Sequence, residues 1–163
     1  MTVFDSLLIE NSNLIEQSIY EGYRPPPPLT ALEWVESEDG PVLSERTSGI
    51  SGKLSLDVTP YLRFPLEVFS DRHVERMALC FGTQSGKTTF LQCALGYVID
   101  YDPGPTMFLR PTMNEASEFS RDRMIPFILD CPTLARHVPG RIEDNLKPLE
   151  YRLDRMTMRY AWS

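Results

Sequence analysis

A nine-residue stretch from Phe81 to Thr89, with the sequence FGTQSGKTT, constrains the fold more than any other part of the chain. Residues 74–80 precede it, end in an apolar run and predict a buried strand. Apolar residues recur at helical spacing after it and predict a helix: Phe90, Leu91, Ala94, Leu95, Val98 and Ile99. A glycine-bearing turn between a strand and a helix that ends in Gly-Lys-Thr is typical of a phosphate-binding loop.

Such a loop surrounds phosphate oxygens with backbone N–H groups, and the N-terminus of the following helix adds a partial positive charge. In this arrangement Lys87 would contact the β- and γ-phosphates, and the Thr88 hydroxyl would bind Mg²⁺. One position departs from the usual pattern, because Phe81 stands where a glycine is expected five residues before Gly86. The alternative interpretation is an ordinary turn between strand and helix with a surface lysine.

Length and composition indicate a globular chain of one domain, since 163 residues can bury a core and no apolar run is long enough to span a membrane. The N-terminus lacks a signal-peptide pattern. Three cysteines, Cys80, Cys93 and Cys131, are far apart in apolar surroundings, which predicts buried free thiols in a reducing compartment and no metal site.

The net charge of −7 is concentrated in residues 1–60, which carry ten acidic and three basic side chains. Residues 110–163 carry nine basic side chains, nearly all arginine, against eight acidic ones. The acidity of the whole chain therefore does not exclude a nucleic-acid partner, and the mixed charge of the second half does not require one.

Residues 1–24 form the first predicted segment, an amphipathic helix over residues 2–20. Its apolar positions are Phe4, Leu7, Leu8, Leu14, Ile15 and Ile19. Either this helix packs on its own domain or it docks a partner. Residues 25–58 form the second segment, a proline spacer at 25–28 and an irregular lead-in, in which Thr30 and Glu33 have the spacing of a capping box.

Residues 59–163 form the third segment, an α/β unit with a parallel-sheet βαβ core and flanking helices. We expect a short helix near Leu66, and a second buried strand over 107–109 that follows a helix ending near Asp100. A capped helix should begin after Thr112 and be interrupted at Pro126. Alternating apolar residues on both sides of residues 154–155 predict a C-terminal hairpin.

Taken together, these motifs resemble the large terminase subunit of tailed phages, in the lambda-type or GpA group. The resemblance covers about residues 25–140 and rests on the order and spacing of short motifs. These are Leu29 and Glu33-Trp34, residues 59–63, Gln84 to Thr88, Gly96-Tyr97 with Ile99-Asp100 and Pro103, Pro111-Thr112, Ala116, Phe119-Ser120, Pro126 and residues 131–134. It implies a partial P-loop NTPase fold, in which residues 59–163 are an incomplete ATPase domain.

Large terminases pump phage DNA into preformed capsids with an N-terminal ATPase and cut it with a C-terminal metal-dependent nuclease. The resemblance implies ATP and Mg²⁺ as cofactors, Lys87 as the catalytic residue and Thr88 as the metal ligand. The ATP-binding residues that it implies are Gly82, Thr83, Gln84, Ser85, Gly86, Lys87, Thr88, Thr89, Tyr61 and Arg63. It places the chain in the host cytoplasm, and its implied partners are the small terminase subunit (through the N-terminal helix), double-stranded DNA and the capsid portal.

Two catalytic elements of a packaging ATPase are not found in this sequence. No apolar run ending in Asp-Glu follows Thr89, and Asp130 after Phe127-Ile128-Leu129 is a weak substitute. The loop contains no arginine, which leaves Arg110, Arg121 and Arg123 as candidates for a phosphate contact. We expect an N-terminal fragment that binds ATP. The alternatives are a different P-loop enzyme, helicase-like or a small kinase, and an inactive remnant that only binds partners.

Overall fold

The structure is a computed structural model that describes residues 29–43 and 52–163. The predicted N-terminal helix and the four-proline spacer lie outside the described residues. Described helices are α2 (Ala31–Glu36), the 3₁₀ turn η1 (Pro60–Leu62), α3 (Arg63–Phe69), α4 (Lys87–Asp100), α5 (Met113–Phe119), the π-helical turn η2 (Ser120–Met124), α6 (Ile125–Asp130), α7 (Pro132–Ala135) and α8 (Ile142–Asn145). Described strands are β1 (Val42–Leu43), β2 (Gly52–Lys53), β3 (Thr106–Arg110), β4 (Leu146–Lys147), β5 (Glu150–Arg152) and β6 (Thr157–Trp162).

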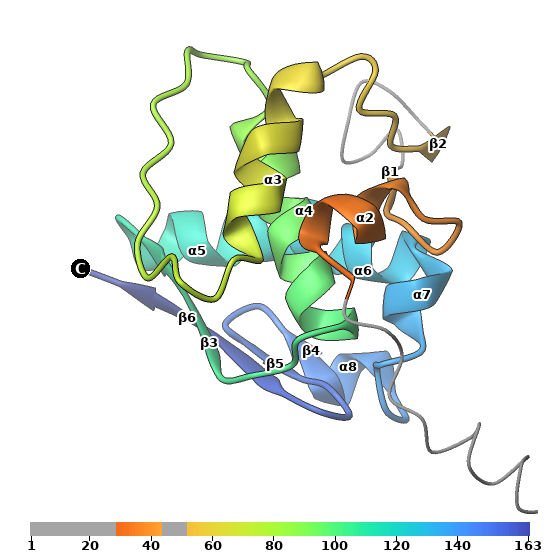
Figure 1. The fold of residues 1–163 in the computed structure, drawn as a ribbon. Helices are drawn as coiled ribbons and strands as arrows, with labels where there is room; N and C mark the ends of the chain where they lie inside the picture. The colour runs from red at the N-terminus through yellow and green to blue at the C-terminus, as the bar shows by residue number, and fades with distance from the viewer. Residues whose placement is uncertain (1–28, 44–51) are drawn as a thin grey trace, which may run out of the picture.

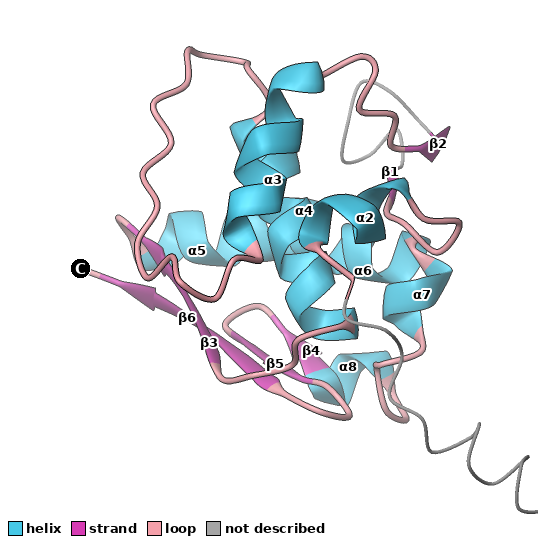
Figure 2. Cartoon of the chain, viewed as in Figure 1, coloured by secondary structure: helices cyan, strands magenta, loops and turns pink. Residues whose placement is uncertain are grey.

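A four-stranded mixed sheet with the order β3-β6-β5-β4 forms one layer of the molecule. Strands β3 and β6 are parallel, with Thr106 opposite Met158, and β6 is antiparallel to β5. Helices α4, α5 and α6 lie on one side of this sheet (Figures 1 and 2). A short antiparallel pair, β1 with β2, is separate from it. The protein is therefore of the α/β class, with helices gathered over a mixed sheet.

The predicted strand at 74–80 is wrong, because this segment has no regular secondary structure and is mostly exposed. No described strand pairs with it, and an isolated extended segment lacks the ladder that stabilises a strand. The parallel pair of the fold is instead β3 with β6, and the chain between them forms helices α5 to α8 and then strands β4 and β5. The predicted βαβ unit across residues 74–109 is therefore not formed.

The second predicted strand is confirmed as β3. The prediction that this strand is buried is wrong for two of its residues. Met107 and Leu109 are 71% and 62% exposed, since they lie on the face of the sheet opposite the helices. Phe108 points to the other face, where its ring stacks on that of Phe119 at a centroid distance of 5.0 Å. Parallel strands are usually covered on both faces. Here one face of the β3–β6 pair is open.

The remaining local predictions from turn and cap residues are confirmed. Thr30 and Glu33 form a reciprocal capping box at the start of α2, and the Thr112 hydroxyl accepts from the backbone N–H of Glu115 at the start of α5. Helix α3 covers the predicted short helix. Helix α4 ends at Asp100, α6 restarts beside Pro126, and β5 and β6 form the predicted hairpin.

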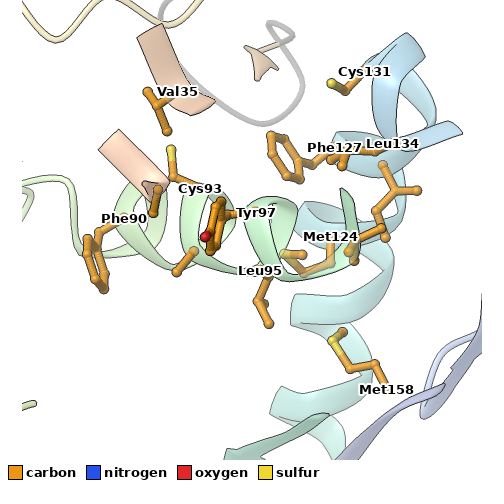
Figure 3. Packing of buried hydrophobic residues seen from close by; sticks show 14 of the residues in the cluster. Val35, Phe90, Cys93, Leu95, Tyr97, Met124, Phe127, Cys131, Leu134 and Met158 are labelled. Carbon is orange, nitrogen blue, oxygen red and sulfur yellow. The ribbon is translucent and has the colours of Figure 1, made fainter. Parts of the chain in front are cut away.

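Helix α4 is the centre of the core. Its Cys93 side chain points toward Val35 of α2 (Figure 3). Trp34 packs so closely on the same helix that a Cβ at Gly96 would lie 2.6 Å from the indole ring. Since real Cβ atoms do not approach other atoms so closely, only glycine allows α2 to pack here. Residues of α6 and α7, among them Phe127 and Leu134, fill the other side of this cluster (Figure 3).

The three cysteines do not share one environment. Cys93 and Cys131 are buried and free, as predicted, and burial raises the pKa of the Cys93 thiol to about 12. Cys80 is exposed, so its predicted burial is wrong. The reason is the same as for the missing strand, because residues 74–80 do not enter a sheet.

The C-terminal end of α4 is fixed by the buried carboxylate of Asp100. This carboxylate accepts hydrogen bonds from Trp34 Nε1 at 2.9 Å and from Arg136 at 2.7 Å, and His137 Nε2 lies 2.9 Å away. Burial by itself would raise the pKa of Asp100, but the bonds from His137, Arg136 and Trp34 outweigh it and hold the pKa below its usual value. On its other side, His137 Nδ1 lies 3.0 Å from the Asp154 carboxylate.

We predict that Asp100→Asn lowers the free energy of unfolding at pH 7 by about 1–3 kcal/mol, because an amide cannot satisfy the three donors that surround this site. A carboxyl group whose folded pKa is lowered stabilises the fold above its unfolded pKa of about 3.9 and loses that effect as the pH falls through the folded pKa. Urea unfolding from pH 7 to pH 3 should therefore show the difference between wild type and variant shrinking below about pH 4.

Asp102→Asn is the matched control, since Asp102 is exposed and follows the helix by two residues. It should change the free energy of unfolding by less than about 0.5 kcal/mol. Equal destabilisation by the two variants, or a difference that does not shrink at low pH, would contradict this account of Asp100.

Candidate phosphate-binding loop

The predicted loop connects the exposed segment 74–80 to the first turn of α4. Gly86 is the N-cap of α4 and has φ 79°, in the left-handed region that favours glycine. Phe90 N donates to Gly86 O at 2.8 Å and thereby closes the first turn. No side chain caps this end of the helix. The first N–H groups of a 14-residue helix are thus left for an external acceptor, and its dipole favours an anion there.

Lys87 is folded back onto the loop. Its Nζ donates to the carbonyl oxygens of Phe81 at 3.1 Å and Gly82 at 2.5 Å. The Ser85 hydroxyl also donates to Gly82 O, at 2.6 Å. The Lys87 ammonium group is therefore bound to carbonyl oxygens of its own loop. A bound phosphate would replace these two neutral acceptors with anionic oxygens, to which an ammonium group forms stronger hydrogen bonds.

Tyr61 of η1 lies against the same loop. Its ring meets that of Phe81 edge to face at a centroid distance of 6.1 Å. A Cβ at Gly86 would lie 3.7 Å from the Tyr61 hydroxyl and 3.5 Å from Leu62. Phe81, which departs from the usual loop pattern, thus packs the loop on η1. No sequence pattern predicts this contact or the Ser85 hydrogen bond.

Arg63 does not join the loop through any contact found in the described residues. Its guanidinium forms ion pairs with Glu36 and, at 3.0 Å, with Asp57. Both predicted nucleotide contacts thus belong to one short segment, but only Tyr61 is directed to the loop in this structure.

The predicted metal ligand Thr88 is exposed on the first turn of α4, beside the exposed loop residues Gly82, Thr83 and Gln84. Within residues 29–43 and 52–163, no three His, Cys, Asp or Glu side chains are grouped to hold a metal ion. Bound Mg²⁺ would therefore depend on the Thr88 hydroxyl, nucleotide phosphates and water. That ligand set suits this cation, because Mg²⁺ retains several waters when it binds.

The other candidate residues are spread over the second half of the chain. Asp130 is exposed at the end of α6. Arg110 ends β3 with its guanidinium 5.1 Å from the Phe119 ring centroid, and Arg121 Nε donates to Ser117 O at 3.4 Å. Arg123 borders a pocket with Arg110. No contact described for Asp130, Arg110 or Arg121 reaches the loop.

Among the helices of the described residues, none has the length and apolar character needed to cross a membrane. Comparison with known proteins found no matching curated protein and no matching solved structure. One family model does match, that of the phage terminase large subunit gpA ATPase domain, over residues 48–158. This match covers about two thirds of the chain and includes the loop, α4, strands β3, β4 and β5, and the first two residues of β6. The chain belongs to the gpA ATPase family of phage terminase large subunits.

Proposed function

We propose that this chain binds ATP with Mg²⁺ through residues 82–89, as part of the ATP-driven motor that packages phage DNA. The observation that carries the proposal is the uncapped N-terminus of α4 preceded by Gly86 in the left-handed conformation, with the Lys87 ammonium group held beside it. The family match supports ATP as the nucleotide, since it is to an ATPase domain. Lys87 would bind phosphate oxygens, and the Thr88 hydroxyl would bind Mg²⁺.

Tyr61 supports the nucleotide proposal from outside the loop. Its side chain is 49% exposed and its hydroxyl lies beside the Gly86 N-cap. An aromatic ring at this position offers a surface on which an adenine base can stack. Arg63 remains a proposed nucleotide contact, and reaching ATP would require it to leave Glu36 and Asp57.

The proposed role stops at nucleotide binding. Hydrolysis requires a carboxylate that activates water, and the sequence after Thr89 has no apolar run ending in Asp-Glu. We infer a partial P-loop domain whose partners in the packaging motor are double-stranded DNA, the small terminase subunit and the capsid portal, in the cytoplasm of the host. These partners are proposed from membership in the family.

Lys87→Ala should reduce Mg·ATP affinity at least tenfold in calorimetry, because the variant loses the only lysine of the loop. Lys147→Ala is the matched control, since Lys147 is an exposed lysine of β4 and lies far from the loop in the sequence. It should bind as the wild type does. Hydrolysis measured on the same samples should be absent in all three proteins.

Three outcomes would contradict the proposal in different ways. Equal binding by Lys87→Ala and wild type would place the nucleotide elsewhere. No binding by a folded wild type would favour the inactive remnant that only binds partners. Turnover of ATP by the wild type would show that a catalytic acid is present and would favour a complete P-loop enzyme.

Deletion of residues 1–24 should abolish pull-down of the small terminase subunit and leave ATP binding unchanged, if the amphipathic segment docks that subunit. Its apolar positions are the expected contact surface. Unchanged pull-down by the deletion variant would reject the docking role and favour a helix that packs on its own domain.

A further inference from the structure

The side chain of His137 is buried, with 7% of it exposed, between two carboxylates from distant parts of the chain. Its Nε2 lies 2.9 Å from an oxygen of Asp100 at the end of α4. Its Nδ1 lies 3.0 Å from both oxygens of Asp154, in the turn between β5 and β6. A carboxylate only accepts hydrogen bonds, whereas a neutral imidazole has one N–H donor and one acceptor nitrogen. Both contacts are therefore hydrogen bonds only when both ring nitrogens carry a proton.

Besides these two carboxylates, two guanidinium groups face the His137 ring. Arg136 Nε and Arg155 Nη2 each lie 3.4 Å from its Nε2, and the charge of Asp39 acts on Arg136 from beyond the end of α2. Nearby cations disfavour a positively charged ring. Because both of them approach Nε2, loss of a proton is easiest at this nitrogen, which can then accept a hydrogen bond from a guanidinium group.

Further bonds hold the same turn to α4 and to the segment after α7. Asp154 N donates to His137 O at 2.9 Å, and Arg155 Nη2 donates to Asp100 O at 2.6 Å. Of these linking groups, histidine is the one that titrates closest to neutral pH. A cavity of about 620 Å³ is bordered by Asp100 and Arg155, so water can reach the edge of this cluster and exchange protons with it.

We propose that His137 is a proton-dependent clamp, which in its doubly protonated form holds the β5–β6 turn to the C-terminal end of α4. When Nε2 gives its proton to water, the ring keeps its bond to Asp154 and loses the one to Asp100. The lone pair of Nε2 then faces the Asp100 oxygen and repels it, and Arg155 donates to the bare nitrogen instead. The turn thereby loses one of its bonds to α4 and shifts against the helix. The inference does not depend on ATP binding, because no group of the clamp belongs to the phosphate-binding loop.

NMR of the whole chain tests the protonation state directly, because the chain has two histidines and His73→Gln leaves only the signals of His137. At pH 7 both ring nitrogens of His137 should show the ¹⁵N shifts of protonated nitrogen. As the pH is raised to about 9.5, Nε2 should lose its proton and Nδ1 should keep its own. One unprotonated ring nitrogen at pH 7, loss of the proton from Nδ1 first, or two protons retained at the highest pH would overturn the proposal.

Movement of the turn is measured on methionine methyl groups in the same samples. Met156 is buried in the turn, and its carbonyl oxygen accepts from Leu153 N at 2.9 Å. Its methyl resonance should shift with the same midpoint as the His137 ring. The methyl resonance of Met113, which is exposed on α5, is the internal control and should not shift. A Met156 resonance that stays constant while Nε2 loses its proton would overturn the clamp.

Arg155→Gln removes one of the two cations that face Nε2, so it should move the loss of the proton to higher pH by about half a unit. Arg152→Gln is the matched control, since Arg152 is an exposed arginine of β5 that pairs with Glu150, and it should leave the midpoint unchanged. Equal midpoints in the two variants, or a shift to lower pH in Arg155→Gln, would also overturn the proposal.

Discussion

The packing of α2 on α4, locked by the Trp34 side chain, is the interaction on which the rest of the structure depends. The indole ring covers Gly96 at a distance that excludes any larger residue, and its Nε1 donates to Asp100 at the end of the same helix. Through Asp100 the helix is tied to Arg136 and His137. Arg155 in the hairpin turn donates to the Asp100 carbonyl at 2.6 Å. A helix fixed at its C-terminal end in this way holds its N-terminal end, and hence the loop, in a defined place.

The C-terminal end of α4 is fixed by these bonds, whereas the region around the phosphate-binding loop is more exposed. The segment before the loop is exposed, one face of β3 is bare, and an apolar slot separates them. Hydrogen bonds from Lys87 and Ser85 to the loop carbonyls stabilise the loop locally without help from a neighbouring strand. The molecule thus combines a well-packed helical core with a sheet whose β3 strand is exposed on one face.

Sequence reasoning was most successful where local chemistry decides the structure. The capping box at Thr30, the N-cap at Thr112, the end of α4 at Asp100 and the hairpin between β5 and β6 follow from short-range spacing. It failed for residues 74–80 and for the burial of Cys80, because a strand needs a neighbour and periodicity cannot show whether one exists. The phosphate-binding role of residues 82–89 and the nucleotide contact of Tyr61 stay predictions. The Asp100–His137 contact joins residues far apart in sequence, and no local motif predicts it.

The most direct test of the central claim is a crystal structure of the whole chain with Mg²⁺ and a non-hydrolysable ATP analogue. Our account predicts that Lys87 Nζ leaves the carbonyl oxygens of Phe81 and Gly82 and lies within hydrogen-bond distance of phosphate oxygens, with Mg²⁺ on the Thr88 hydroxyl. A nucleotide bound at another place, with Lys87 still on those two carbonyls, would contradict it.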